Sequence, residues 1–205
     1  MKKNRISKSW IIKQHRDQFY KKSKVLGYRS RSAFKLIELN KKFKFIFKNT
    51  NLLDVGSSPG GWSQVASSII RGGKIVAIDK KPMEKIKNVV FFKDDFSNEV
   101  SKNKLLKIFE NKIDVIISDM AADTTGNKDL DCIRTNSLCS EVIEFSTQVL
   151  KKKGILVAKL FMGEDFLEVK DRAKKIFKKV EFYKPNSSRS ESKETYIHCV
   201  RLNSL

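Results

Sequence analysis

Short apolar runs alternate along this chain with segments in which apolar residues recur at helical spacing. The apolar runs predict strands at 51–55, 74–78, 89–92, 114–118, 155–161, 180–183 and 195–200. Helical spacing predicts helices at 32–39, 62–70, 98–110, 134–151 and 166–177. Strands that alternate with helices form a mostly parallel sheet with helices on both faces. Because no helix separates the last two runs, we expect one antiparallel strand in this α/β sheet.

One charged residue interrupts a strand that is otherwise apolar. Lys159 follows the apolar residues at 155–158 and precedes Leu160 and Phe161. An unpaired ammonium is costly to bury, so a lysine persists in such a strand if it is paired or if a lowered pKa is useful. The alternative is a side chain that reaches solvent at the end of the strand. Lys159 is therefore either a site residue or a solvated strand end.

Glycine or acidic residues stand at the ends of three other predicted strands. Gly56 follows the first strand, Asp79 the second and Asp119 the fourth. Ligands of such sheets bind beyond the carboxyl ends of the strands, near the point where the strand order reverses. We therefore expect these residues and Lys159 to lie on one rim of the sheet.

The turn after the first strand reads GSSPGGW at 56–62. Its glycines allow close approach to a ligand, and the helix that follows offers free backbone N–H groups. Asp79 stands where an acid commonly binds a ribose diol, and Asp94 or Asp95 could accept the amino group of an adenine. The turn matches neither the dinucleotide motif nor a P-loop. It predicts an adenosine-type cofactor; a purely structural turn and a solvated acidic loop are the alternatives.

Positive charge is concentrated in the first part of the chain. The 205 residues carry 43 Lys and Arg against 23 Asp and Glu, and residues 1–48 hold 16 of the former and two of the latter. Aromatic residues are interleaved there, at Trp10, Phe19, Tyr20, Tyr28 and Phe34. This pattern favours a nucleic-acid backbone as partner, with a membrane surface or a transit peptide as rival interpretations. We expect a basic arm at 1–31 and one domain at 32–205.

Cysteine and histidine are sparse. The three cysteines form no CxxC pair and the two histidines stand far apart, so we expect neither disulfides nor a metal site. No apolar run is long enough to span a membrane. We expect an intracellular monomer without membrane association; the cytoplasm and an organelle such as the mitochondrion both stay open.

Five segments in order resemble the FtsJ/RrmJ-type RNA ribose 2′-O-methyltransferases over nearly the whole chain. They are YRSRSAFKL at 28–36, GSSPGGWSQ at 56–64, SDMA at 118–121, VAK at 157–159 and the stretch from Ser188 to Tyr196. The resemblance implies a Rossmann-like fold that uses S-adenosylmethionine. It implies a catalytic tetrad of Lys35, Asp119, Lys159 and Glu194. The cofactor contacts it implies are Gly56, Gly60, Gly61, Trp62, Asp79, Asp95 and Asp119.

The resemblance also implies an activity and a substrate. It is strongest to enzymes that methylate a uridine ribose in large-subunit ribosomal RNA, as free RNA or in a ribosomal subunit. Alternatives are a methyltransferase of the transfer-RNA anticodon loop, an RNA-binding protein without catalysis and, more weakly, a NAD-dependent enzyme. Two departures from the family are Ser57-Ser58 in place of two alanines and Ala122-Asp123 in place of Pro-Asn.

A general base follows from the chemistry of such a transfer. An ordinary lysine, with a pKa of about 10.4, is protonated at neutral pH. We expect burial beside Lys35 and near the positive sulfur of the cofactor to lower the pKa of Lys159. Lys35 would then orient the hydroxyl, and Asp119 and Glu194 would balance and aim the two ammonium groups.

Overall fold

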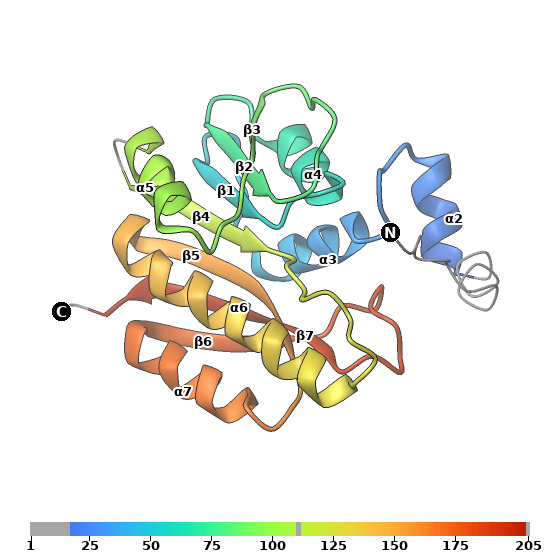
Figure 1. Cartoon of the computed structure of the whole chain (residues 1–205). Helices are drawn as coiled ribbons and strands as arrows, with labels where there is room; N and C mark the ends of the chain where they lie inside the picture. The colour runs from blue at the N-terminus through green and yellow to red at the C-terminus, as the bar shows by residue number, and fades with distance from the viewer. Residues whose placement is uncertain (1–16, 110–111, 204–205) are drawn as a thin grey trace.

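A seven-stranded sheet forms the centre of the protein, whose computed structural model describes residues 17–109 and 112–203 (Figure 1). Its strands are β1 (Leu52–Val55), β2 (Ile75–Asp79), β3 (Val89–Lys93), β4 (Ile113–Ser118), β5 (Leu150–Phe161), β6 (Phe177–Tyr183) and β7 (Glu194–Leu202). They lie in the order β3-β2-β1-β4-β5-β7-β6, with β7 antiparallel to both of its neighbours and the other pairs parallel. The predicted fold class is therefore confirmed, including the single antiparallel strand.

Helices cover both faces of this sheet, and the sheet separates the hydrophobic core into two clusters. The helices are α2 (Gln18–Val25), α3 (Ala33–Phe43), α4 (Gly61–Ile69), α5 (Glu99–Ile108), α6 (Lys128–Val149) and α7 (Phe166–Ile176). One cluster packs α3 and α4 against the sheet through Leu36, Leu39 and Val65. The other packs α5, α6 and α7 against the opposite face, for example through Leu105 and Ile143. Burial of these apolar faces is the main stabilising contribution to the fold.

The largest differences from the sequence prediction lie in α6, β5 and α2; in addition, α3 ends at Phe43 instead of residue 39 and β6 begins at Phe177 instead of residue 180. Helix α6 begins at Lys128 instead of residue 134, because Asn127 caps it by accepting hydrogen bonds from the N–H groups of Asp129 and Leu130. Strand β5 begins at Leu150, before an exposed stretch of lysines that masks its strand character. Helix α2 was not predicted; its mean composition is polar, and tertiary contacts hold it in place.

Helix α2 is fixed to the domain at its start. The side chain of Asp17 accepts hydrogen bonds from the N–H groups of Phe19 and Tyr20, at 3.0 and 3.2 Å, and so caps the helix. The rings of Phe19 and Tyr28 then pack on Phe34 of α3, with centroids 5.5 and 5.7 Å apart. These aromatic residues of the basic arm thus join α2 to the domain. Trp10 and the rest of 1–16 lie outside the described residues.

No helix within the described ranges is both long enough and apolar enough to cross a lipid bilayer.

Candidate active site

Lys159 occupies the face of the sheet that α3 covers. It lies on β5 opposite Tyr196 of β7, two residues after Val157, which belongs to the core on the α3 side. Alternate residues of a strand share a face, so the Lys159 side chain extends toward α3. Only 8% of the residue is exposed to solvent, which excludes the solvated strand end.

The buried ammonium is paired with two carboxylates. Lys159 Nζ lies 2.7 Å from Asp119 Oδ1 and 3.6 Å from Glu194 Oε2, and it donates a hydrogen bond of 3.0 Å to the Asp119 carbonyl. Glu194 also pairs with Lys35, whose Nζ lies 2.7 Å from Oε1 and 2.8 Å from Oε2. The structure thus brings together the four residues of the predicted tetrad, from α3, the end of β4, β5 and the start of β7.

Two further side chains complete the hydrogen bonding of these carboxylates. The fully buried Tyr196 donates a 2.7 Å hydrogen bond to Asp119 Oδ1. Ser188 donates one of 2.7 Å to Glu194 Oε1. Sequence reasoning did not assign either residue a role. The sequence could have indicated a role for Tyr196, because Tyr196 lies two positions after Glu194 and therefore on the same face of the strand.

The electrostatics of the cluster correct one expectation. Burial lowers the pKa of Lys159, but attraction to Asp119 and Glu194 outweighs burial, and the net shift is upward. Burial likewise raises the pKa of Asp119 and of Glu194, and the two ammonium groups reverse both shifts, so both carboxyl groups have lowered pKa values. The predicted lowering of the Lys159 pKa is therefore wrong, because attraction to the two carboxylates is stronger than the effect of burial.

Asn136 holds the end of the strand that carries Lys159. It is fully buried on α6, its Oδ1 accepts from the N–H of Phe161 at 2.8 Å, and its Nδ2 donates to the Phe161 carbonyl at 3.0 Å. Nδ2 also donates to Asp165 Oδ1 at 2.7 Å. This clamp replaces the strand partner that β5 loses at its end. No sequence signal distinguished Asn136 from a solvated helix residue.

The turn after β1 approaches its neighbours too closely for side chains. Gly56 has φ +76°, and a Cβ there would collide with Met120 after β4. Gly60 has φ +110° and caps α4, which Gly61 begins. The first turn of α4 has N–H groups without intrahelical partners, so it can receive a polar ligand group. The glycines thus allow tight packing of the turn, and the free N–H groups of α4 are the feature that suits a polar group of a cofactor.

Two acids stand beside this turn at the ends of β2 and β3. Asp79 accepts hydrogen bonds from the N–H groups of Ser58 and Lys81, at 2.9 and 2.7 Å. Asp95 accepts from Ser97 N–H at 3.0 Å, and Lys80 Nζ lies 3.0 Å from it. Burial raises the pKa of Asp95, but these contacts lower it on balance. Both acids are thus fixed as hydrogen-bond acceptors, which fits the hydroxyl and amino groups of an adenosine.

Trp62 supports the site by packing beneath two of its elements, α3 and β7. Its side chain is buried, packs against Tyr196 with ring centroids 5.6 Å apart, and donates a 2.8 Å hydrogen bond to the carbonyl of Ser32. It therefore aligns α3, which carries Lys35. Because the indole is enclosed, a contact between Trp62 and a cofactor would involve its backbone.

Asp54 is a buried acid beneath the turn. Its Oδ2 accepts a 2.6 Å hydrogen bond from Ser63 of α4, whereas its Oδ1 has no hydrogen-bond partner. Burial raises the pKa of Asp54 to about 7, although the Ser63 hydrogen bond opposes the shift. Asp54 therefore ties β1 to α4 in a form that is easily protonated.

Arg29 and Gln64 connect the basic arm to the same turn. The Arg29 guanidinium donates to the carbonyls of Pro59, Glu84 and Lys85 at 3.3, 2.7 and 3.0 Å. Gln64 on α4 accepts from the N–H of Arg29 at 2.8 Å and donates to the carbonyl of Gly27 at 3.0 Å. The segment that leads from α2 to α3 is thus bonded directly to the cofactor turn.

The loop that departs from the family pattern also reaches this rim. Asp123 lies 3.7 Å from Lys81, in an exposed ion pair that joins the loops after β4 and β2. Exposed pairs of this kind contribute little to stability. Within 17–109 and 112–203, no group of three or more His, Cys, Asp or Glu residues is arranged to hold a metal ion.

The sequence matches a family model and close relatives along its length. The model for FtsJ-like methyltransferases matches residues 28–202. The chain is 50% identical over 200 residues to Ribosomal RNA large subunit methyltransferase E of Pelagibacter ubique, covering 97% of this chain and 98% of the relative. It is 41% identical over 206 residues to the protein of the same name from Rickettsia akari, covering 97% and 91%.

Solved structures share the fold. A crystal structure from Plasmodium falciparum, assigned as a ribosomal RNA methyltransferase, superposes with a TM-score of 0.75 at 34% identity and covers 85% of this chain and 98% of that one. A methyltransferase of Streptococcus mutans in complex with SAH has a TM-score of 0.53 at 15% identity, covering 84% and 96%, and supports the fold alone.

Asp54 gives a pH-dependent stability that a substitution should remove. The unfolded chain releases the Asp54 proton near pH 4 and the folded chain near pH 7, so stabilisation is lost as pH rises through this window. We expect Asp54→Asn to gain unfolding free energy relative to the wild type between these pH values, by up to about 4 kcal/mol. Urea unfolding at several pH values measures the difference, with Asp171→Asn on α7 as a control. A difference that does not change with pH contradicts the role given to Asp54.

Proposed function

This chain belongs to the FtsJ-like methyltransferase family, and on that premise we propose that it methylates a ribose 2′-hydroxyl, of a uridine, in large-subunit ribosomal RNA. The observation that carries the proposal is the buried cluster of Lys35, Asp119, Lys159 and Glu194 beside a glycine turn. A protein that only bound RNA would gain nothing from four buried charges, which are costly to desolvate. The relatives' names support ribosomal over transfer RNA.

The residues of the rim fit the methyl donor that the family implies. We propose that Gly56, Gly60 and Gly61 give its amino-acid part access to backbone N–H groups, with Trp62 contributing through its backbone. Asp79 would hold the ribose and Asp95 the adenine, with Asp119 at the reacting end. S-adenosylmethionine, when bound, supplies a methyl group activated by a positively charged sulfur.

The four charged side chains would position and deprotonate the ribose hydroxyl. Lys35, held by Glu194, donates a hydrogen bond to the hydroxyl oxygen and fixes its direction. Lys159, in its neutral form, accepts the proton as the oxygen becomes methylated. Asp119 and Glu194 aim Lys159 Nζ and stabilise the ammonium that forms. Placement of the reacting groups in one orientation supplies a large part of the acceleration.

The basic arm would bind the RNA backbone. We propose that the arm comprises residues 1–31 and the catalytic domain residues 32–205. Helix α2 carries the exposed Lys21 and Lys24. It lies beside α3, the helix that carries Lys35 (Figure 1). Such contacts set the orientation of the RNA and carry no sequence information.

Substitution of the proposed base tests the function directly. Because arginine does not release its proton, Lys159→Arg should lower kcat by about 10³-fold and leave S-adenosylmethionine binding within about twofold. The assay is transfer of labelled methyl groups to large ribosomal subunits that lack the modification, with calorimetry for the cofactor. Lys151→Arg, at the exposed start of β5, is the matched control. Substantial turnover by Lys159→Arg refutes the base; no turnover by the wild type refutes the proposed function.

The raised pKa of Lys159 predicts a particular pH profile. In the free enzyme only the small neutral fraction is active, and this fraction grows as pH rises. The value of kcat/KM for the cofactor should therefore rise with unit slope from about pH 7 to beyond about pH 9. Profiles of kcat/KM at RNA and cofactor concentrations below saturation report the free enzyme and provide the test, with cofactor binding measured separately. A plateau of kcat/KM below about pH 8 contradicts the upward shift.

Salt dependence tests the arm. Each phosphate contact contributes about −0.7 to −0.9 to the slope of log affinity against log salt. We expect steep loss of RNA affinity with salt, and Lys21→Ala should make the slope shallower by about one such contact. Filter binding between low and physiological salt measures this. Lys174→Ala on α7, far from α2 in Figure 1, should change nothing; a flat wild-type response contradicts an arm that binds phosphates.

A further inference from the structure

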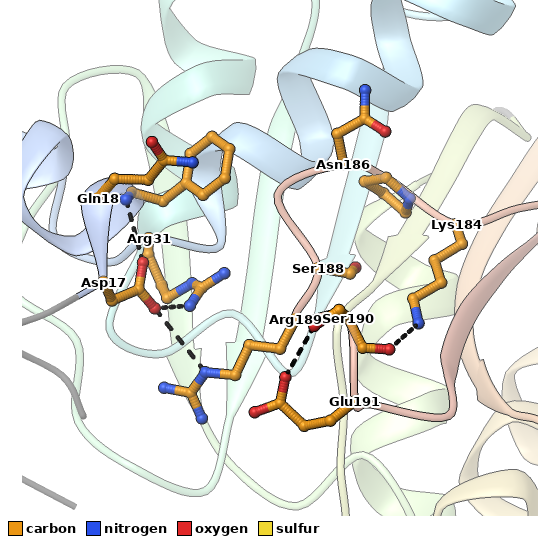
Figure 2. Close-up of a pocket in the computed structure, with 11 residues that line it drawn as sticks. Asp17, Gln18, Arg31, Lys184, Asn186, Ser188, Arg189, Ser190 and Glu191 are labelled. Carbon is orange, nitrogen blue, oxygen red and sulfur yellow. Dashed lines mark hydrogen bonds and ion pairs between the residues drawn. The ribbon is translucent and has the colours of Figure 1, made fainter.

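A groove of about 720 Å³ separates the start of α2 from the loop that joins β6 to β7 (Figure 2). Its walls come from two parts of the chain that are far apart in the sequence: Asp17, Phe19 and Arg31 on one side, and residues 184–186 and 188–191 on the other. The volume is within the range of small-molecule sites, about 300–1,000 Å³. None of the tetrad residues lines it, so it is a feature separate from the site described above.

The groove nevertheless adjoins the tetrad. Ser188 lies in its wall, and the Ser188 hydroxyl donates to Glu194 Oε1 at 2.7 Å. Glu194 in turn holds Lys35 at 2.7 Å. Two side chains, those of Ser188 and Glu194, therefore separate the groove from the ammonium that would orient the reacting hydroxyl. A polymer with its reacting ribose at Lys35 would place a neighbouring unit in or near the groove.

Arginine side chains give the groove a phosphate-binding wall. Asp17 pairs with Arg31 and lies 3.8 Å from Arg189 Nε, so two guanidinium groups converge on one carboxylate (Figure 2). Asp17 is nearly enclosed, whereas the side chain of Arg189 is 36% exposed. The long Arg189 contact leaves most donors of its fork available for another anion. Arginine forks of this kind match phosphate oxygens.

An aromatic and a proline side chain provide an apolar surface beside these cations. The ring of Phe19 packs on Phe34 at a centroid distance of 5.5 Å but is only half-buried, and the buried Pro185 lines the opposite wall. The Arg31 guanidinium lies 5.8 Å from the centre of the Phe19 ring. A partly exposed aromatic ring beside an arginine is a common contact for an unstacked base of single-stranded RNA.

Resting on the proposed function, we propose that this groove binds one nucleotide that flanks the methylated ribose. Arg189, positioned by Asp17, holds the phosphate of that nucleotide, and the base of the nucleotide lies against Phe19. The groove therefore fixes the path of the RNA between the arm and the tetrad. It recognises an unstacked nucleotide, so the RNA must be single-stranded or opened next to the target.

The phosphate contact is tested by comparing the effect of a substitution on KM with its effect on kcat, with large ribosomal subunits that lack the methyl group as substrate. Arg189→Ala should raise KM for the subunit about fivefold or more, with kcat and cofactor affinity within about twofold, and Arg189→Lys should recover part of the loss. Arg172→Ala, a partly exposed arginine on α7, is the control. Thermal unfolding checks that α2 remains in place. An unchanged KM for Arg189→Ala overturns the phosphate assignment.

The base contact is tested with short labelled oligouridylates that carry one abasic unit at successive positions. The wild type should bind the intact RNA about fivefold or more tightly than the RNA abasic at one position. Phe19→Leu, which preserves apolar packing on Phe34, should abolish that difference, and Phe47→Leu, at a phenylalanine 62% exposed elsewhere, should retain it. A difference that persists in Phe19→Leu overturns the proposal.

These binding measurements separate the two hypotheses. If the wild type transfers no methyl group, the proposed function has failed, whereas the oligouridylate experiment still reports on the groove. If methyl transfer occurs but the Arg189 and Phe19 substitutions change neither KM for the subunit nor affinity for the oligouridylates, the groove is only a packing interface between α2 and the loop. In that case only the further inference has failed.

Discussion

The Lys159 ammonium, enclosed between Asp119 and Glu194, sets the arrangement of the whole active edge. Loss of one partner from a buried ion pair costs about 3–5 kcal/mol, since the remaining charge stays desolvated. Here each charge has its partner on a different element: the end of β4, the middle of the sheet, the start of β7 and, through Lys35, helix α3. The charges sum to zero, so the cluster can be buried only when all four elements are in register.

Sequence reasoning predicted the fold and, through the family resemblance, the four charged residues that the structure brings together, but not the groups that support them. Lys159 stood out because an apolar strand makes a charge conspicuous, and the alternation of strands and helices defined the sheet. Asn136 and Ser188 gave no signal, because their importance depends on partners 25 and six residues away that only the folded chain brings near. The direction of the Lys159 pKa shift was wrong for a related reason: its sign depends on distances to carboxylates, which a sequence does not contain.

Helix α2 shows a second limit of sequence reasoning. Its apolar residues are too few for a clear periodic pattern, and its position depends on Asp17, which caps the helix and pairs with Arg31 and Arg189. The same carboxylate thus sets one wall of the groove and the first turn of α2. From composition alone, this basic segment is predicted only to attract polyanions. In the structure, Asp17 gives its helix a defined orientation.

Arg29 gives the arm and the cofactor turn a common anchor. Its guanidinium holds the carbonyl of Pro59 inside the turn, while Gln64 of α4 grips the backbone on either side of Tyr28. Through these hydrogen bonds, a displacement of the turn would be transmitted to the C-terminal end of α2, and a displacement of α2 would be transmitted to the turn. Thermodynamic linkage requires that any such effect be reciprocal: a ligand that stiffens the turn and tightens the RNA complex is itself bound more tightly when RNA is present. The cofactor and the RNA, which meet only where the methyl group is transferred, would then also affect each other's binding through a single arginine distant from that point.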